Sequence, residues 1–217
     1  STDLREVMDF MNLTPDGPEG SKVFFRSVPS MGEANLNADT EVGKDDKNTV
    51  SQHKKFVLVA APHTSNWDAI YFTAAATLTK LKPKFLIKNT WMKFPFNLVF
   101  KPIGGIGVDN KNFSRNKSFS TIDFMVNLFR QKKELIIMIA PEGTRSKNPN
   151  WRTGFYRTAV LAKVPLVLGY LDYQKKIAGF NKVFTPTGDV ELDIKKISDF
   201  YSQFTGKNHH LFAPYKV

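Results

Sequence analysis

Short apolar runs that alternate with helical patterns constrain the fold of this chain more than any other feature. Each run is short enough for a buried strand and is bounded by polar or turn-forming residues. The runs cover residues 56–61, 85–87, 135–140 and 164–171. The helical patterns cover residues 68–81, 117–131 and 154–163. This alternation predicts an α/β fold, with a largely parallel sheet flanked by helices as an αβα sandwich.

The first 55 residues differ in composition from the rest of the 217-residue chain. Residues 3–11 show a short amphipathic helical period, and residues 22–28 are a candidate strand. Residues 29–55 are polar, as in a long exposed loop. We expect a polar N-terminal extension over residues 1–55 and one domain over residues 56–217. Because the chain begins at Ser1 and not at Met, the sequence leaves open an upstream membrane anchor.

Several classes of chemistry find no support in the sequence. Cysteine is absent, which excludes a cysteine nucleophile, disulfides and thiolate metal sites. Neither a phosphate-binding loop nor a Gly-x-Ser-x-Gly elbow is present. His53 lies in the polar loop, and His209 and His210 have no carboxylate close in sequence, so we expect no metal site at these histidines.

The net charge of +11 is concentrated in one part of the chain. Residues 1–55 contain 7 Lys/Arg against 10 Asp/Glu, whereas residues 110–182 contain 14 against 4. Such a positive field attracts anionic lipid, a phosphorylated substrate or nucleic acid. Charge alone leaves these three partners open.

Polar residues directly after the first apolar run form the first candidate site. They read Pro62-His63-Thr64-Ser65-Asn66-Trp67-Asp68. Positions five apart in one helix point about 140° apart, so His63 must precede the helix to meet Asp68. Ser65 or Asn66 suits the N-cap, which puts Asp68 in the first turn. A His–Asp dyad would then support general-base catalysis; the alternative is an unconnected turn histidine and helix-start aspartate.

A second polar block follows the apolar run 135–140. It reads Pro141-Glu142-Gly143-Thr144-Arg145-Ser146-Lys147. Gly143 permits a tight turn, Arg145 offers a planar fork for phosphate oxygens, and Glu142 is placed to orient that arginine. The alternative is a solvated loop with a weak Glu–Arg surface pair.

The two blocks together resemble the glycerophosphate and lysophospholipid acyltransferase family, in which His and Asp five positions apart precede Pro-Glu-Gly-Thr-Arg. The resemblance runs from about Phe56 to about Tyr173. It implies that His63 is the general base on the acceptor hydroxyl and that Asp68 orients it. It also implies that a group of four residues binds the acceptor's phosphate: Glu142, Gly143, Thr144 and Arg145.

The middle family block departs from its usual form. It resembles Gly-x-x-x-Asp-Arg, but here Asn110 stands at the arginine position of the block that begins at Gly105. Lys111 or Arg115 is a candidate replacement cation. A different acceptor headgroup would explain the departure equally well.

The resemblance implies transfer of a fatty acyl group from acyl-CoA or acyl carrier protein to a lysophospholipid such as 1-acyl-glycerol-3-phosphate. Neither block contains a serine or cysteine nucleophile of recognisable type, so we expect direct transfer without an acyl-enzyme, a metal or a bound cofactor. Backbone amides near the helix start after His63 are candidates for stabilising the oxyanion.

We expect peripheral attachment to the cytoplasmic face of an anionic membrane, since no apolar run approaches the roughly 18 residues that span a bilayer. The aromatic segment 91–101, with lysines around it, is the candidate contact. Its alternatives are a core helix or the wall of an acyl-chain groove. The resemblance favours lipid over nucleic acid as the partner.

Three other functions stay open. A glycerol-3-phosphate acyltransferase and an amino-lipid N-acyltransferase are alternatives within the enzyme class. A basic, non-catalytic membrane-binding module is the alternative outside it. Headgroup, acyl-chain length, donor carrier and oligomeric state do not follow from the sequence.

Overall fold

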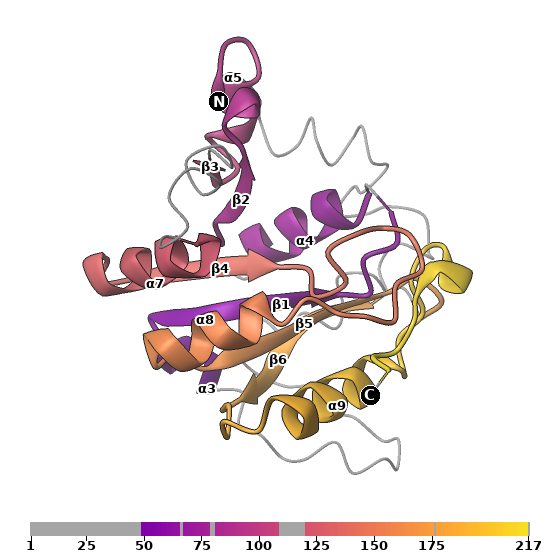
Figure 1. Ribbon diagram of the computed structural model, residues 1–217. Coiled ribbons are helices and arrows are strands. Elements are labelled where there is room, and N and C mark those ends of the chain that lie inside the picture. The colour runs from indigo at the N-terminus through magenta and orange to yellow at the C-terminus, as the bar shows by residue number, and fades with distance from the viewer. Residues whose placement is uncertain (1–48, 66, 79–80, 109–119, 176, 217) are drawn as a thin grey trace.

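A four-stranded sheet forms the centre of the molecule (Figure 1). The computed structural model describes residues 49–65, 67–78, 81–108, 120–175 and 177–216. The strands are β1 (Lys55–Ala61), β4 (Leu135–Ile139), β5 (Leu166–Asp172) and β6 (Ile177–Phe184). Their order is β4-β1-β5-β6; β1 is parallel to both neighbours and β6 is antiparallel to β5. The predicted α/β fold with a largely parallel sheet is confirmed.

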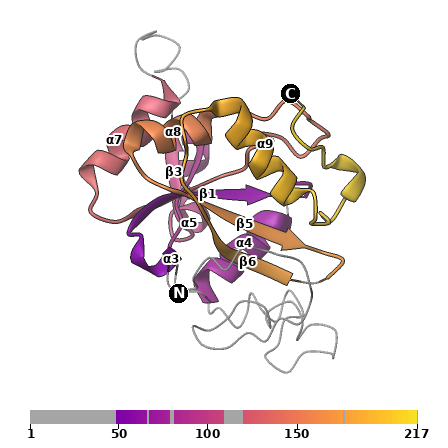
Figure 2. The same ribbon diagram turned by 90° about the horizontal axis from the view of Figure 1, so that it is seen from below.

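Helices cover both faces of this sheet, as Figures 1 and 2 show. Phe56 and Leu58 pack on the side of α4 (Trp67–Leu78). Val57 and Val59 pack on the opposite side. That side is covered by α7 (Thr121–Gln131), α8 (Gly154–Ala162) and α9 (Val190–Tyr201). Because β1 is buried on both faces, it appears in the sequence as a continuous apolar run.

Four short helices complete the set of described helices. They are α3 (Thr49–Gln52), η1 (Asn89–Met92), α5 (Asn97–Phe100) and η2 (His209–Leu211). The end of the predicted polar loop is thus corrected: residues 49–52 are helical, and Lys55 pairs with Leu135 as the first residue of β1. The predicted helix at 3–11 and strand at 22–28 lie outside the described residues. Among the helices that the structure describes, none is long and apolar enough to cross a bilayer.

The predicted strand at residues 85–87 does not continue the central sheet. Lys84 forms a bridge with Ile137 of β4, after which the chain turns away. β2 (Phe85–Lys88) then pairs in parallel with β3 (Gly105–Val108) as a separate two-stranded sheet. We call residues 85–108, from β2 through η1 and α5 to β3, the projecting unit, because they stand away from the central sheet in Figure 1.

The parallel pairing brings the ends of β1, β4 and β5 to the same edge of the sheet. Loops after parallel strands meet at such an edge, where α/β proteins place their binding sites. α9 is tied to this part of the sheet by Tyr201, whose buried hydroxyl lies 2.8 Å from the carbonyl of Val59 and 3.1 Å from that of Gly169. The loop after β1 therefore starts from a rigid base.

Candidate active site

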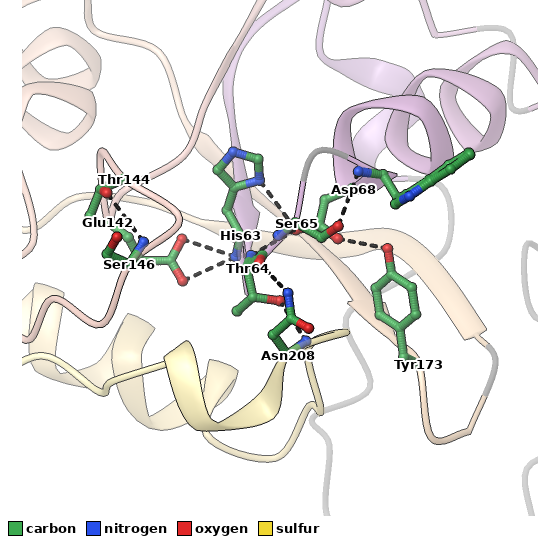
Figure 3. Close-up of polar contacts among 10 residues, drawn as sticks. His63, Thr64, Ser65, Asp68, Glu142, Thr144, Ser146, Tyr173 and Asn208 are labelled. Carbon is green, nitrogen blue, oxygen red and sulfur yellow. Dashed lines mark hydrogen bonds and ion pairs between the residues drawn. The ribbon is translucent and has the colours of Figure 1, made fainter.

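His63 and Asp68 meet in the loop between β1 and α4 (Figure 3). β1 ends at Ala61 and α4 begins at Trp67, so His63 precedes the helix and Asp68 lies in its first turn. Nδ1 of His63 is 3.3 Å from Oδ2 of Asp68. The Asp68 side chain is fully buried, whereas a quarter of the His63 side chain is exposed. The pair thus combines an enclosed carboxylate with an imidazole that reaches solvent.

Three donors in addition to the histidine hold Asp68 in place. Oδ2 accepts hydrogen bonds from the N–H groups of Thr64 at 2.7 Å and Ser65 at 2.8 Å. Oδ1 accepts one from the hydroxyl of Tyr173 at 2.6 Å. Burial of a carboxylate is costly unless such bonds replace its water. They also fix its orientation toward His63.

Tyr173 is a site residue that the sequence did not reveal. It follows β5, the strand beside β1 in the sheet. The pKa of its phenol is raised well above the usual range, first by burial and then by the hydrogen bond to Asp68. The hydroxyl therefore remains a donor across the physiological pH range. A lone tyrosine after a strand has no sequence signature; the β1–β5 pairing brings it to Asp68.

Glu142 supports the histidine loop from the opposite side. Its side chain is buried, and both carboxylate oxygens lie 3.0 Å from the backbone nitrogen of His63. Burial raises the pKa of this carboxyl to about 7, although the hydrogen bond from His63 opposes the shift. We predicted Glu142 as a phosphate-binding residue that orients Arg145. That role stays a prediction; in the structure its carboxylate accepts the His63 N–H, because β4 and β1 are parallel neighbours whose loops meet.

The residues after Glu142 turn outward. Gly143 has φ +64°, and a Cβ there would lie 2.6 Å from Cδ of Arg152, so the predicted tight turn is confirmed. Thr144 is exposed, and its hydroxyl accepts from the N–H of Ser146 at 3.2 Å. Arg145 is exposed as well. This segment is accessible to a solute, as a phosphate-binding loop requires.

The expectation that amides near the helix start stabilise an oxyanion is not supported. The amide of each described residue between His63 and Asp68 donates to an acceptor within the protein. His63 donates to Glu142, Thr64 and Ser65 donate to Asp68, and Trp67 and Asp68 donate to Ser65. The packing that orients Asp68 therefore uses the donors that we proposed for the oxyanion.

The C-terminal part of the chain closes around the histidine loop. Asn208 donates from its backbone N–H to Oγ1 of Thr64 at 3.2 Å and from Nδ2 to the Thr64 carbonyl at 2.8 Å (Figure 3). The N–H of Tyr173 donates to the carbonyl of Thr205 at 2.8 Å. A Cβ on Gly206 would lie 2.8 Å from Oγ1 of Thr64, so this contact is tightly packed. These residues were also missed by sequence reasoning.

The remaining predicted phosphate ligands are not placed at this site by the structure. Lys111 and Arg115 lie outside the described residues, as does Asn110. Gly105, the first residue of the middle block, belongs to β3 of the projecting unit. Within the described part of the chain, no three His, Asp or Glu side chains gather as metal ligands would.

Of the comparisons with known proteins, one matches a span that contains both motifs. A family model described as Acyltransferase matches residues 42–168. A search of curated proteins finds no match. Among solved structures, the chain is similar to the 1-acyl-sn-glycerophosphate (LPA) acyltransferase PlsC from Thermotoga maritima, at 15% identity and a TM-score of 0.46. The match covers 68% of this chain and 63% of that one, so it spans less than two thirds of the PlsC chain.

Proposed function

Because the chain belongs to the acyltransferase family, we propose that it transfers a fatty acyl group from a thioester donor to the free hydroxyl of a lysophospholipid. The donor is acyl-CoA or acyl carrier protein, and the acceptor is of the 1-acyl-glycerol-3-phosphate type. The observation that carries the proposal is the contact between Nδ1 of His63 and the buried Asp68 carboxylate. That contact leaves Nε2 as the nitrogen available to a substrate.

In the proposed reaction, Nε2 of His63 takes the proton of the acceptor hydroxyl as its oxygen attacks the thioester carbonyl carbon. A C–O bond forms, and the C–S bond breaks when the tetrahedral intermediate collapses. The leaving thiolate takes the proton back from His63 and departs as free thiol. Asp68 fixes the imidazole tautomer and stabilises the imidazolium while it exists.

Arg145 is the proposed principal contact for the acceptor's phosphate, with Thr144 as a hydroxyl donor. An arginine fork binds phosphate oxygens in pairs, and Arg145 is exposed on the loop that follows β4. The contact between the Glu142 carboxylate and the His63 backbone N–H supports this assignment, because it holds the loop that carries Arg145 next to the loop of the candidate base. Lys111 and Arg115 remain predicted phosphate ligands.

The test measures thiol release from acyl-CoA and the acylated product, with lysophosphatidic acid as acceptor. We expect His63→Ala to lower kcat/KM by about 10²- to 10⁴-fold, the usual contribution of a general base. His209→Ala is the matched control, because His209 is exposed in η2. Circular dichroism verifies that all three proteins are equally folded.

Two outcomes would reject the proposal. Equal product formation by His63→Ala would remove the general base. No turnover with lysophospholipid, glycerol phosphate or amino-lipid acceptors, from either donor type, would leave a membrane-binding module. Turnover with glycerol-3-phosphate or an amino lipid alone would keep the acyltransferase but change its acceptor.

A further inference from the structure

The projecting unit exposes an unusual amount of apolar surface. Ten large hydrophobic side chains are exposed among the described residues, and six of them fall within residues 85–108. They are Trp91 (44%), Phe94 (79%), Phe96 (48%), Leu98 (66%), Val99 (59%) and Ile103 (41%). Neither η1 nor α5 buries any residue. Exposed apolar residues that gather in this way mark a contact surface.

Residues 91–101, which we call the tip of the projecting unit, contact one another. The Trp91 ring packs edge-on against Phe96 and Phe100, with centroid separations of 5.0 and 5.6 Å. The backbone N–H groups from Asn97 to Lys101 all donate to carbonyls within the tip. Backbone groups that enter lipid need partners within the protein. These five amides of α5 and its C-cap already have them.

The charge around the tip is uniformly positive. Residues 69–108 contain six lysines and no Asp or Glu. Lys88, Lys93 and Lys101 are exposed on the projecting unit itself. Lysines close to an anionic membrane surface are attracted by its negative potential. Apolar side chains beside lysines are typical of segments that lie in a membrane interface.

From this combination we propose that the projecting unit inserts its apolar tip into the interface of an anionic phospholipid bilayer. A second copy of the chain is the poorer partner, because an isologous contact would bring the lysines of both copies together. The inference goes beyond acyl transfer, since it concerns binding to lipid without donor or acceptor. It gives residues 91–101 a surface role and not the role of a core helix.

The test is cosedimentation of the full chain with vesicles, without acyl donor or acceptor. We expect binding to vesicles of 30% phosphatidylglycerol in phosphatidylcholine and at least tenfold weaker binding to pure phosphatidylcholine. The double variant Phe94→Asp, Leu98→Asp should weaken binding to anionic vesicles at least tenfold. The control double variant Leu161→Asp, Leu192→Asp replaces two exposed leucines outside the projecting unit with the same charges. It should change binding less than twofold.

Trp91 provides a second readout that does not depend on a variant that alters folding. Its fluorescence should shift to the blue and be quenched by brominated lipid; Trp91→Phe removes that signal from the background of Trp67 and Trp151. Unchanged Trp91 emission, or equal binding by the two double variants, would overturn the inference. Concentration-dependent self-association that only the Phe94, Leu98 variant abolishes would overturn it in favour of a second copy. Acyl transfer to a short-chain acceptor in solution, measured separately, tests the proposed function alone.

Discussion

The backbone N–H of His63 lies 3.0 Å from both carboxylate oxygens of Glu142, which joins two residues 79 positions apart in the sequence. Glu142 follows β4 and His63 follows β1, and these strands are parallel neighbours. The contact therefore links the loop of the candidate base to the loop of the candidate phosphate-binding residues. A change in the protonation state of Glu142 therefore affects the hydrogen bond that joins these two loops.

Glu142→Gln should make the stability less dependent on pH. Burial raises the pKa of Glu142 from 4.5 to about 7 in the folded state. Between these values the folded state keeps a proton that the unfolded state has lost, so stability falls as pH rises. At about 1.4 kcal/mol per pKa unit, the variant should gain about 2–3 kcal/mol relative to wild type from pH 5 to pH 8. Urea unfolding at both pH values measures this difference.

Glu134→Gln is the control for that experiment. Glu134 is exposed, and its hydrogen bond with Lys54 lowers the pKa of its carboxyl. Its contribution is lost only as pH falls through the folded pKa, below the range used. The difference from wild type should therefore stay flat from pH 5 to pH 8. A flat difference for Glu142→Gln as well would contradict the prediction.

Tyr173→Phe should lower kcat about tenfold with little change in KM. The substitution removes the 2.6 Å hydrogen bond to Oδ1 of Asp68, and a bond to a charged group contributes about 1.5–3 kcal/mol. Without this donor the Asp68 carboxylate is held less firmly toward His63, so the candidate base is oriented less well. Steady-state kinetics with varied acceptor concentration separates the effect on kcat from that on KM.

Tyr156→Phe separates this positioning role from a loss of stability. Tyr156 of α8 donates a comparable 2.7 Å hydrogen bond to the buried Asp193 of α9. Both variants should be destabilised in urea, but only Tyr173→Phe should lower kcat. Equal kcat values for the two variants would assign Tyr173 a purely structural part.

Asp68→Asn should reduce kcat/KM by about 10³-fold or more, since a neutral amide neither orients the imidazole correctly nor stabilises its charged form. It should also destabilise the fold. Both Asp68 oxygens accept hydrogen bonds, so either orientation of the amide sets its NH₂ group against a donor. Steady-state kinetics and urea unfolding measure the two effects. Asp199→Asn, at an exposed ion pair with Lys195, should leave activity within twofold; full activity of Asp68→Asn would exclude the dyad.

Arg145→Ala should raise KM for a phosphate-bearing acceptor about 10- to 100-fold, the range expected for a lost charge-assisted hydrogen bond. The kcat should change less, because Arg145 is not assigned to proton transfer. Lys147→Ala, at another exposed cation of the same loop, tests for a general charge effect. If the two variants raise KM equally, the specific phosphate contact is absent. A monoacylglycerol acceptor, which has no phosphate, should be insensitive to Arg145→Ala.

The sequence predicted what depends on local pattern. Continuous apolar runs identified β1, β4 and β5. For β1 and β5 the reason is that strands buried on both faces need apolar residues throughout. The period of the helix required His63 to precede α4 and placed Asp68 in its first turn, and both are found. Ser65, proposed as an N-cap, does accept from the Trp67 N–H.

What depends on strand pairing could not be predicted. Tyr173 reaches Asp68 because β5 lies beside β1, and the inward direction of Glu142 depends on β4 lying on the other side. The strand at residues 85–87 was recognised, but its partner was not. Only Lys84 contacts β4 before β2 pairs with β3, and a run of three apolar residues does not specify which neighbour it will take.

The family match spans residues 42–168. The hydrogen bonds from Asn208 to Thr64 cross its boundary, and the one from Tyr173 to Thr205 lies entirely beyond it. A chimera that grafted that span onto another protein would inherit both motifs, yet it would lose Tyr173, Thr205 and Asn208. The chimera would lack the Tyr173 hydroxyl that donates to Asp68 and the Asn208 hydrogen bonds that hold Thr64. A transplant of the complete His63–Asp68 surroundings would therefore have to include residues 169–217 as well as the family span.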